Sequence, residues 1–185
     1  MARTDGSPRR AGTGRGEQRK GWDAVRRIGI TGHRFIPREA LDHIRVGLRT
    51  ALHGHTGAGA LQAYSSLAVG ADQLFADLAL EHGAELTAVI PSGNYTEDFG
   101  APGELARFEE LRGRAAREVR LGFPRSTGEA YYAAGAYIAD HCDRLLAVWD
   151  GAPARGLGGT ADIVRYAREQ GVPVTVIWRA GLERP

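Results

Sequence analysis

The sequence predicts an α/β fold, a doubly wound open parallel sheet of about six strands with helices on both faces. From Arg27 onward, short β-branched or aliphatic runs alternate with stretches of helical period, the order expected of strands and crossover helices. Several of these runs are apolar on both sides, as in strands that helices cover on two faces. The 185 residues contain no interior repeat or linker, so we expect a single domain at 27–180.

The predicted strands are 27–31, 61–67, 85–91, 118–124, 144–150 and 173–178. Between them apolar residues recur every three or four positions, which predicts five helices around 41–52, 74–78, 105–111, 130–138 and 163–167. Gly83 and Gly171 follow two of these patterns, at places where a glycine ends a helix before the next strand.

The formal net charge of +2 is unevenly distributed along the chain. Residues 1–27 carry 8 basic and 3 acidic side chains, whereas residues 28–185 carry 16 basic and 19 acidic ones. The domain itself is therefore mildly acidic. This distribution disfavours nucleic acid as a partner, except through the basic N-terminal segment. The arginines between 112 and 120 are the strongest basic cluster of the domain, and we assign them to the solvated face of one helix.

Both ends of the chain are predicted to be tails. Residues 1–26 are rich in Gly and Arg and almost free of large aliphatic residues, so we expect a disordered basic tail. Residues 181–185 are predicted as a short C-terminal tail. No stretch has the roughly 18 to 20 apolar residues of a membrane span, and we expect no secretory signal. With a single cysteine, Cys142, an internal disulfide is excluded, and we expect a cytoplasmic protein without a membrane partner.

Candidate binding residues follow the first two strands, where ligands of such sheets bind. After the first strand, Thr31 offers a hydroxyl and Gly32 a tight turn, His33 can act as acid, base or donor, and Arg34 supplies a planar fork of donors. A simple capped turn with a surface arginine is the alternative. After the second strand come Gly70 and Asp72. Gly70 allows close approach of a ligand, and Asp72 either contacts that ligand or satisfies free amides of the following helix.

The segment after the fifth strand gives the sharpest signal, with Asp150, Arg155, Gly158, Gly159 and Thr160 leading into a helix. Glycines before a helix expose backbone amides at its positive end, which favours a bound anion such as phosphate. It is not a Walker A loop, because the Gly-Lys-Ser/Thr ending is absent. Asp162 is either functional or a residue that stabilises the helix start.

Other candidates are weaker. His53 and His55 lack partner ligands at a known metal spacing, so we predict no metal site, and nothing indicates a cofactor. The long loop 91–99 after the third strand has the length of a functional lid. Tyr131 or Tyr132, at the start of a helix, is the tyrosine most suited to face a ligand.

Four motifs together resemble the SLOG superfamily, over residues 27–178: ITGHR, SSLAVGADQLFADLALEHG, AVIP, and CDRLLAVWDG followed by GLGGTADIV. This Rossmann-like group contains the DNA-processing protein DprA, the Lonely guy phosphoribohydrolases and the YpsA-like proteins. The resemblance implies a pocket for a nucleotide or nucleotide-derived ligand. In it the GGT helix start would cradle phosphate and the TGHR loop would line the other side.

In the phosphoribohydrolases the loop reads PGGxGTxxE, and an arginine on the preceding helix takes part in cleavage of the N-glycosidic bond. Gly159, Thr160 and Asp162 match the end of that motif, with Asp for Glu, but residues 133–136 hold no arginine. If the protein is an enzyme, the resemblance makes Asp162 the catalytic candidate. That Arg34 or Arg155 holds the phosphoribosyl group from a different direction is a hypothesis that matches no position of the motif.

Three functions therefore remain. The first is binding of a nucleotide or nucleotide-derived phosphorylated small molecule, as a sensor or effector domain, since the phosphate-binding frame is intact while the catalytic pair is incomplete. The alternative is a nucleoside 5′-monophosphate phosphoribohydrolase, with Asp162 as the catalytic carboxylate. DprA-like nucleic-acid binding ranks third because of the acidic domain. Family members commonly self-associate, so a homo-oligomer is left open.

Overall fold

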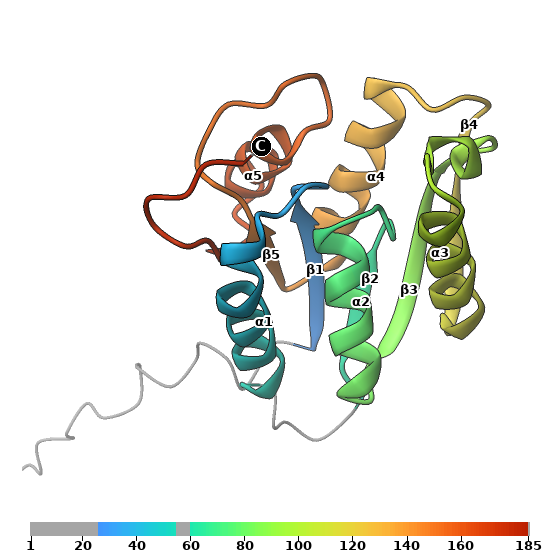
Figure 1. Ribbon diagram of the computed structural model, residues 1–185. Helices are drawn as coiled ribbons and strands as arrows, with labels where there is room; N and C mark the ends of the chain where they lie inside the picture. Colours follow the sequence, from blue (N-terminus) through green and yellow to red (C-terminus); the bar gives the residue numbers. More distant parts are fainter. Residues whose placement is uncertain (1–25, 55–59, 185) are drawn as a thin grey trace, which may run out of the picture.

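The computed structural model describes residues 26–54 and 60–184 (Figure 1). Residues 1–25 of the predicted tail 1–26, and His55, lie outside the described residues. The strands are β1 (Arg27–Gly32), β2 (Gln62–Ser65), β3 (Glu85–Ser92), β4 (Arg117–Phe123), β5 (Arg144–Val148) and β6 (Val174–Val176). The helices are α1 (Arg38–His53), α2 (Ala71–Glu81), α3 (Pro102–Arg114), α4 (Gly128–His141) and α5 (Thr160–Glu169), with a short 3-10 turn η1 (Tyr95–Asp98).

The strands form one sheet in the order β4-β3-β2-β1-β5-β6, and every neighbouring pair is parallel. The predicted doubly wound α/β fold is confirmed. The chain moves outward from β1 to β4 and then returns to the other side of β1 as β5, so the strand order reverses between β1 and β5. A crevice opens at such a reversal, beyond the carboxyl ends of the two strands, and there the fold positions a ligand.

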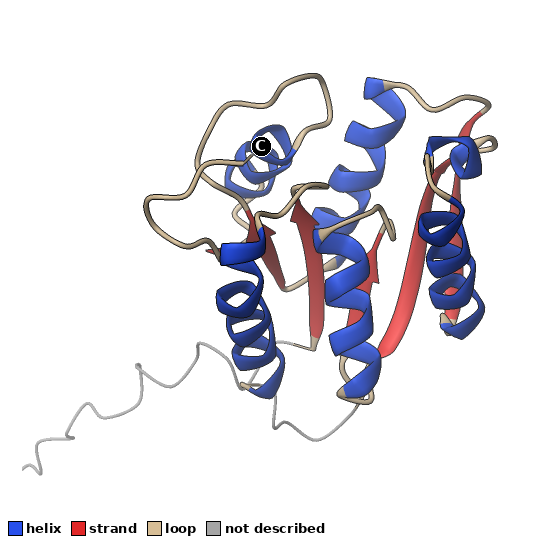
Figure 2. Ribbon diagram, in the orientation of Figure 1, coloured by secondary structure: helices blue, strands red, loops and turns tan. Residues whose placement is uncertain are grey.

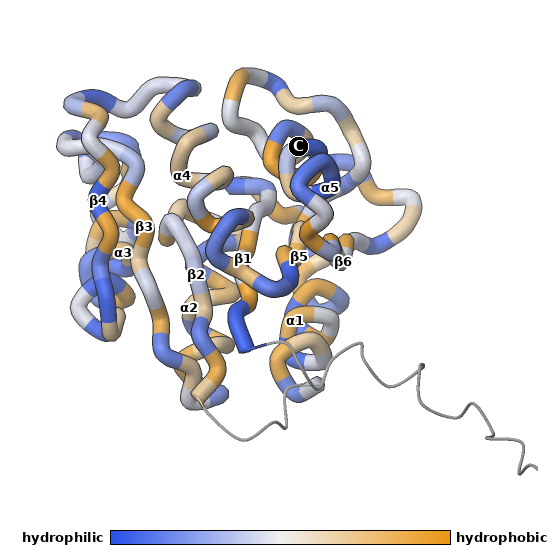
Figure 3. The backbone as a smooth tube through the Cα atoms, turned by 180° about the vertical axis from the view of Figure 1, so that it is seen from behind, coloured by the Kyte–Doolittle hydropathy of each residue, from blue (hydrophilic) through white to orange (hydrophobic). Residues whose placement is uncertain are grey.

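Helices cover both faces of the sheet (Figure 2). The helices α1, α2 and α3 pack on one face over a core that includes Ile44, Leu48 and Phe75, all fully buried. The helices α4 and α5 pack on the other face, where Ile138 and Ile163 meet the central strands. Burying each of these large side chains contributes about 1.5 to 3 kcal/mol. In Figure 3 hydrophobic stretches run along the strands while α1 alternates between hydrophobic and hydrophilic residues.

Close packing explains why glycine occurs in the central strand. A Cβ atom on Gly29 would lie 2.5 Å from the Ile138 side chain, and one on Gly32 would lie 2.4 Å from the Ala71 Cβ. The absence of side chains at these positions lets α4 and α2 approach β1 from opposite faces. Gly83 and Gly171 take positive φ values of 81° and 74° just after α2 and α5, as expected for helix ends.

Two expectations need correction. The arginines between 112 and 120 do not share one helix face, because α3 ends at Arg114 while Arg117 and Arg120 lie in the edge strand β4. They are also paired with carboxylates: Arg112 and Arg120 contact Glu118, and Arg117 contacts Glu85. The long loop after β3 is partly helical, since it contains η1.

Among the described residues, no helix is long and apolar enough to cross a membrane.

The segment after β6 folds back over the domain. It passes the first turn of α1, where the Arg179 guanidinium donates to the Glu39 carbonyl, and then runs toward α5 (Figure 1). The Trp178 indole N–H donates to the Leu182 carbonyl at 2.7 Å, and both side chains pack against the larger core. Residues 178–184 thereby lie beside the carboxyl edge of the sheet.

Candidate functional site

A cavity of about 400 Å³ lies at the carboxyl edge, where the strand order reverses between β1 and β5. Its walls come from the loops after β1, β2, β3 and β5, and from the first turns of α4 and α5. Nine of the residues expected from the sequence line it: Thr31, Gly32, His33, Arg34, Asp72, Arg155, Gly158, Gly159 and Thr160. Gly70, Asp150 and Asp162 are not among its lining residues.

At the start of α5, beside the cavity, two backbone amides lack an acceptor among the described residues. Gly159 is the N-cap of α5, and among the described residues no acceptor contacts the amides of Thr160 and Ala161. Helix N-termini of this kind attract anions because the amides and the helix dipole both favour negative charge. The Arg155 side chain is exposed beside this helix start and forms no ion pair with any described residue.

The shape of the loop depends on Gly158. Its φ of +81° lies in the left-handed region, and a Cβ atom there would sit 2.6 Å from the Tyr132 amide nitrogen and 2.7 Å from the Gly128 carbonyl oxygen. Both contacts are with the backbone at the start of α4, which cannot move aside without shifting the helix. The loop therefore packs against α4 in a way that only glycine permits.

Gly70 plays a similar part on the other side of β1. Its φ is +90°, and a Cβ atom would lie 2.3 Å from the Arg34 carbonyl oxygen and 2.6 Å from that of His33. The Ala71 amide donates to the His33 carbonyl at 3.1 Å. Gly70 thus lies behind the cavity wall and holds the β1–α1 loop in place.

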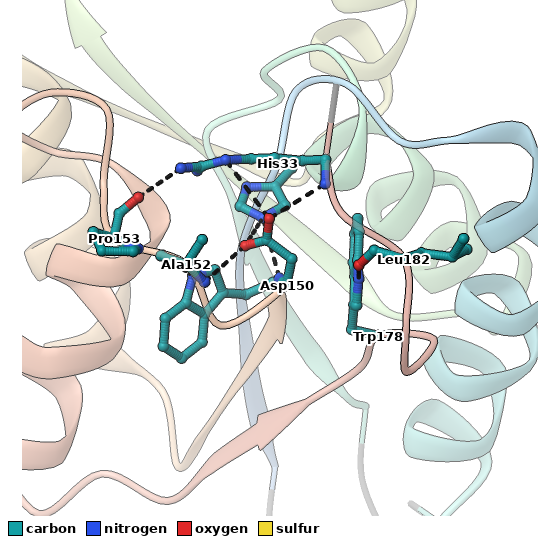
Figure 4. Close-up of polar contacts among 8 residues, drawn as sticks. His33, Asp150, Ala152, Pro153, Trp178 and Leu182 are labelled. Atoms are coloured by element: carbon teal, nitrogen blue, oxygen red, sulfur yellow. Dashed lines mark hydrogen bonds and ion pairs between the residues drawn. The ribbon is translucent and has the colours of Figure 1, made fainter.

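His33 and Asp150 form a buried pair (Figure 4). The His33 Nε2 lies 2.9 Å from the Asp150 Oδ1, and both side chains are about 5% exposed or less. Burial lowers the pKa of His33, against the opposing effect of Asp150. Burial raises the pKa of Asp150, but donors from Ala152, His33 and Arg184 together bring it below its usual value. The Asp150 backbone amide also donates to the His33 Nε2 at 3.2 Å, so two contacts with Asp150 fix the orientation of the imidazole ring.

Arg184 reaches this pair from the C-terminal segment. Its backbone amide donates to the Asp150 Oδ2 at 3.3 Å, and its guanidinium donates to the Pro153 carbonyl at 2.6 Å. Arg184 also lines the cavity. Sequence reasoning missed Arg184 because it lies at the end of the chain, without a motif. Only the fold brings it to Asp150.

Asp162 faces the glycine-rich loop instead of the cavity. Its carboxylate accepts a hydrogen bond from the Gly158 amide at 3.2 Å and pairs with Arg165 at 2.9 Å. These contacts are those of a residue that stabilises a helix start, one of the two interpretations that the sequence allowed.

Asp72 does line the cavity, as a buried carboxyl in the first turn of α2. Burial raises its pKa from 3.8 to about 7, although nearby amides and the charge of Arg34 favour the ionised form. The Ser66 amide donates to its Oδ2 at 3.2 Å. This carboxyl can therefore accept hydrogen bonds from a ligand or exchange a proton near neutral pH.

A polar cluster around Asp98 adjoins the cavity through Arg34 and Tyr131, which line it, and the sequence pointed only to its loop. The Asp98 carboxylate accepts hydrogen bonds from the Ser126 and Tyr131 hydroxyls, each at 2.8 Å. The Asp98 carbonyl accepts one from the Arg34 guanidinium at 3.0 Å. Tyr131 lines the cavity, whereas Tyr132 packs against Tyr166 with ring centroids 5.9 Å apart.

No protein-family model matches the chain, and no protein of curated function matches its sequence. Solved structures match its fold. DNA processing protein A (DprA) from Helicobacter pylori, described by its single-stranded DNA binding mode, aligns with a TM-score of 0.60 at 17% identity, over 85% of this chain and 67% of that one. DprA from Streptococcus pneumoniae aligns with a TM-score of 0.58 at 18% identity, over 81% of this chain.

A third structure, of the protein TM1055, aligns with a TM-score of 0.50 at 16% identity, over 80% of this chain and 72% of that one. This chain spans only 49% of the pneumococcal DprA. At such identities the likeness concerns the path of the backbone. It agrees with the parallel sheet and its strand reversal, and the protein therefore shares the Rossmann-like fold of these three structures.

Proposed function

We propose that the cavity binds a nucleotide or a nucleotide-derived phosphorylated small molecule, and that the protein acts as a sensor or effector domain. The observation that carries the proposal is the start of α5. Its Thr160 and Ala161 amides have no acceptor in the described chain, and Gly158, Gly159 and Thr160 line a cavity of about 400 Å³. Arg155, which has no ion pair within the described residues, adds a positive charge beside them. A phosphate group at this place would be bound by backbone amides and by one charge-assisted hydrogen bond.

Two exposed apolar side chains favour a nucleotide over a bare phosphate. Phe35 is 66% exposed and Leu157 is 56% exposed, and both line the cavity from loops on opposite sides of the strand reversal. Exposed apolar side chains of this size at a cavity mark binding surfaces for apolar groups. A planar base stacked on Phe35 would cover both side chains while its phosphate lies at α5.

Calorimetric titration with the four ribonucleoside 5′-monophosphates tests the proposal. We expect at least one to bind, and Arg155→Ala to weaken its affinity about tenfold through the loss of one charge-assisted hydrogen bond. Arg168→Ala is the matched control, because Arg168 is an exposed arginine in the last turn of the same helix. The absence of binding by all four nucleotides, or equal losses in both variants, would contradict the proposal.

Hydrolysis of the N-glycosidic bond is the second candidate, favoured by the buried carboxyl of Asp72 on the cavity wall. In this reaction water adds to C1′ while the C1′–N bond breaks, and the leaving base takes up a proton. A carboxyl with a pKa of about 7 can handle that proton at neutral pH. Asp162, the catalytic carboxylate that the resemblance implies, is bound to Gly158 and Arg165. Chromatography for free base after incubation with nucleotides distinguishes the two carboxylates as catalytic groups. Only a loss of base release in Asp162→Asn would support a catalytic role for Asp162.

Binding of single-stranded DNA, the property by which the Helicobacter DprA structure is described, is the third candidate. The pairing of Arg112, Arg117 and Arg120 with glutamates leaves this cluster poorly suited to phosphate contacts. A gel shift with the full chain that persists after deletion of residues 1–26 would favour DNA as the ligand of the domain.

A further inference from the structure

One corner of the cavity is polar and lies on the side of β2 and β3, across β1 from the glycine-rich loop. Asp72, at the start of α2, and Tyr95, in the loop after β3, form this corner. The charge of Asp72 contributes to raising the pKa of Tyr95, so the two side chains lie close enough to interact electrostatically. Neither residue contacts the helix start that we assign to phosphate.

The Asp72 carboxyl is held in a fixed position. The Ser66 amide donates to its Oδ2 at 3.2 Å, and the Ser65 hydroxyl donates to its backbone carbonyl at 3.3 Å. The intervening Leu67 has a φ of +58°, a conformation that side chains other than glycine seldom adopt, and its amide donates to the Ser65 Oγ at 3.0 Å. Strained backbone fixed by local hydrogen bonds is typical of segments that preorganise a binding group.

Tyr95 offers a hydroxyl that has no hydrogen-bond partner within residues 26–54 and 60–184. Its side chain is 5% exposed, and its ring packs against Phe99 and Phe108 with centroids 5.4 and 5.6 Å away. The hydroxyl oxygen stays accessible at the cavity that Tyr95 lines, and core packing alone would be served equally by phenylalanine.

Asp72 and Tyr95 therefore give the ligand one hydrogen-bond acceptor and one donor at a distance from its phosphate. The group that lies between phosphate and base in a nucleotide is the sugar, whose hydroxyls both donate and accept. Acidic side chains at the carboxyl end of a strand bind ribose hydroxyls in other doubly wound sheets. Resting on the nucleotide function proposed above, we infer that Asp72 and Tyr95 bind the ribose hydroxyls and make the protein selective for ribonucleotides over 2′-deoxyribonucleotides.

Calorimetric titration of the full chain with the four ribonucleoside 5′-monophosphates and their 2′-deoxy counterparts tests this inference. We expect the best ribonucleotide to bind at least about tenfold more tightly than its deoxy counterpart, because a buried carboxylate would lose a charge-assisted hydrogen bond. Asp72→Asn keeps an oxygen for the Ser66 amide and should bring this ratio close to one. Tyr95→Phe removes only the unbound hydroxyl, so it should lower the ratio while the protein stays folded.

Tyr132→Phe is the matched control, since Tyr132 lies in the first turns of α4 beside the cavity but does not line it. It should leave the ratio unchanged. Equal affinities for ribo and deoxy forms in the wild type, or equal losses for both forms in Asp72→Asn and Tyr95→Phe, would overturn the ribose inference and leave the nucleotide function standing. Failure of all eight nucleotides to bind would overturn both.

Discussion

The His33 Nε2 lies 2.9 Å from the Asp150 Oδ1, although 117 residues separate the two in the chain. The pair joins the loop after β1 to the loop after β5, the two segments on either side of the strand reversal. Its part in the site is to hold both cavity walls at a fixed separation.

Removing the His33 imidazole should destabilise the protein. His33→Ala leaves a buried carboxylate without one of its donors, which costs about 1 to 3 kcal/mol of unfolding free energy. A double-mutant cycle with Asp150→Asn, measured by urea denaturation at pH 8, should give a coupling energy of about 1 kcal/mol or more. Additive effects of the two substitutions would show that the contact does not join the walls.

Two glycines of the same loop should respond differently to alanine. Gly158→Ala introduces a Cβ atom 2.6 Å from a backbone nitrogen of α4 at a φ of +81°, whereas a Cβ on Gly156 meets nothing within 4 Å. We expect Gly158→Ala to cost about 2 kcal/mol and to weaken binding of ribose 5-phosphate at least tenfold. Gly156→Ala should retain wild-type stability and affinity in the same calorimetric titration, and equal affinities in both variants would contradict the role of this loop.

Stability should fall with pH through the titration of Asp72. Its pKa is raised from 3.8 to about 7 on folding, so the folded state holds this proton more tightly than the unfolded chain does. The resulting stabilisation is complete below pH 3.8 and is lost as the pH rises to 7. Relative to Asp72→Asn, which does not titrate, the wild type should lose about 2 kcal/mol of unfolding free energy between pH 5 and pH 7.5. A difference between the two proteins that does not vary with pH would refute the raised pKa.

The contribution of the base can be separated from that of the phosphate. Phe35→Ala should weaken binding of a ribonucleoside 5′-monophosphate about tenfold, because a stacked base contributes about 1 to 3 kcal/mol. It should not affect binding of ribose 5-phosphate, which has no base. Val46→Ala is the control, since Val46 is an equally exposed apolar residue, 64% exposed, on α1. Similar losses for both ligands in Phe35→Ala would mean that Phe35 supports the loop and not the base.

Much of this architecture could be predicted from the sequence, because it depends on local patterns. The apolar runs indicated all six strands, and polar residues after β1, β2 and β5 pointed to the cavity, since the carboxyl ends of parallel strands share one edge. Gly158 could be predicted as part of the binding loop, because glycine before a helix allows backbone conformations that other residues rarely adopt.

Contacts between segments that are far apart in the sequence could not be predicted from local patterns. Arg184 contacts Asp150 only because the segment after β6 turns back, and Asp98 meets Tyr131 only because η1 lies beside α4. The sequence also left two interpretations of Asp72 and Asp162, capping or ligand contact, which depend on where a carboxylate points. In the fold Asp72 faces the cavity and Asp162 faces the Gly158 amide.

The most direct measurement is a crystal structure of the protein grown with the ribonucleoside 5′-monophosphate that binds most tightly in solution. We predict that the phosphate oxygens lie within hydrogen-bond distance of the Thr160 and Ala161 amides, with the Arg155 side chain turned toward them. A nucleotide whose phosphate lies away from the start of α5, or that binds outside the cavity, would contradict phosphate binding at this helix start.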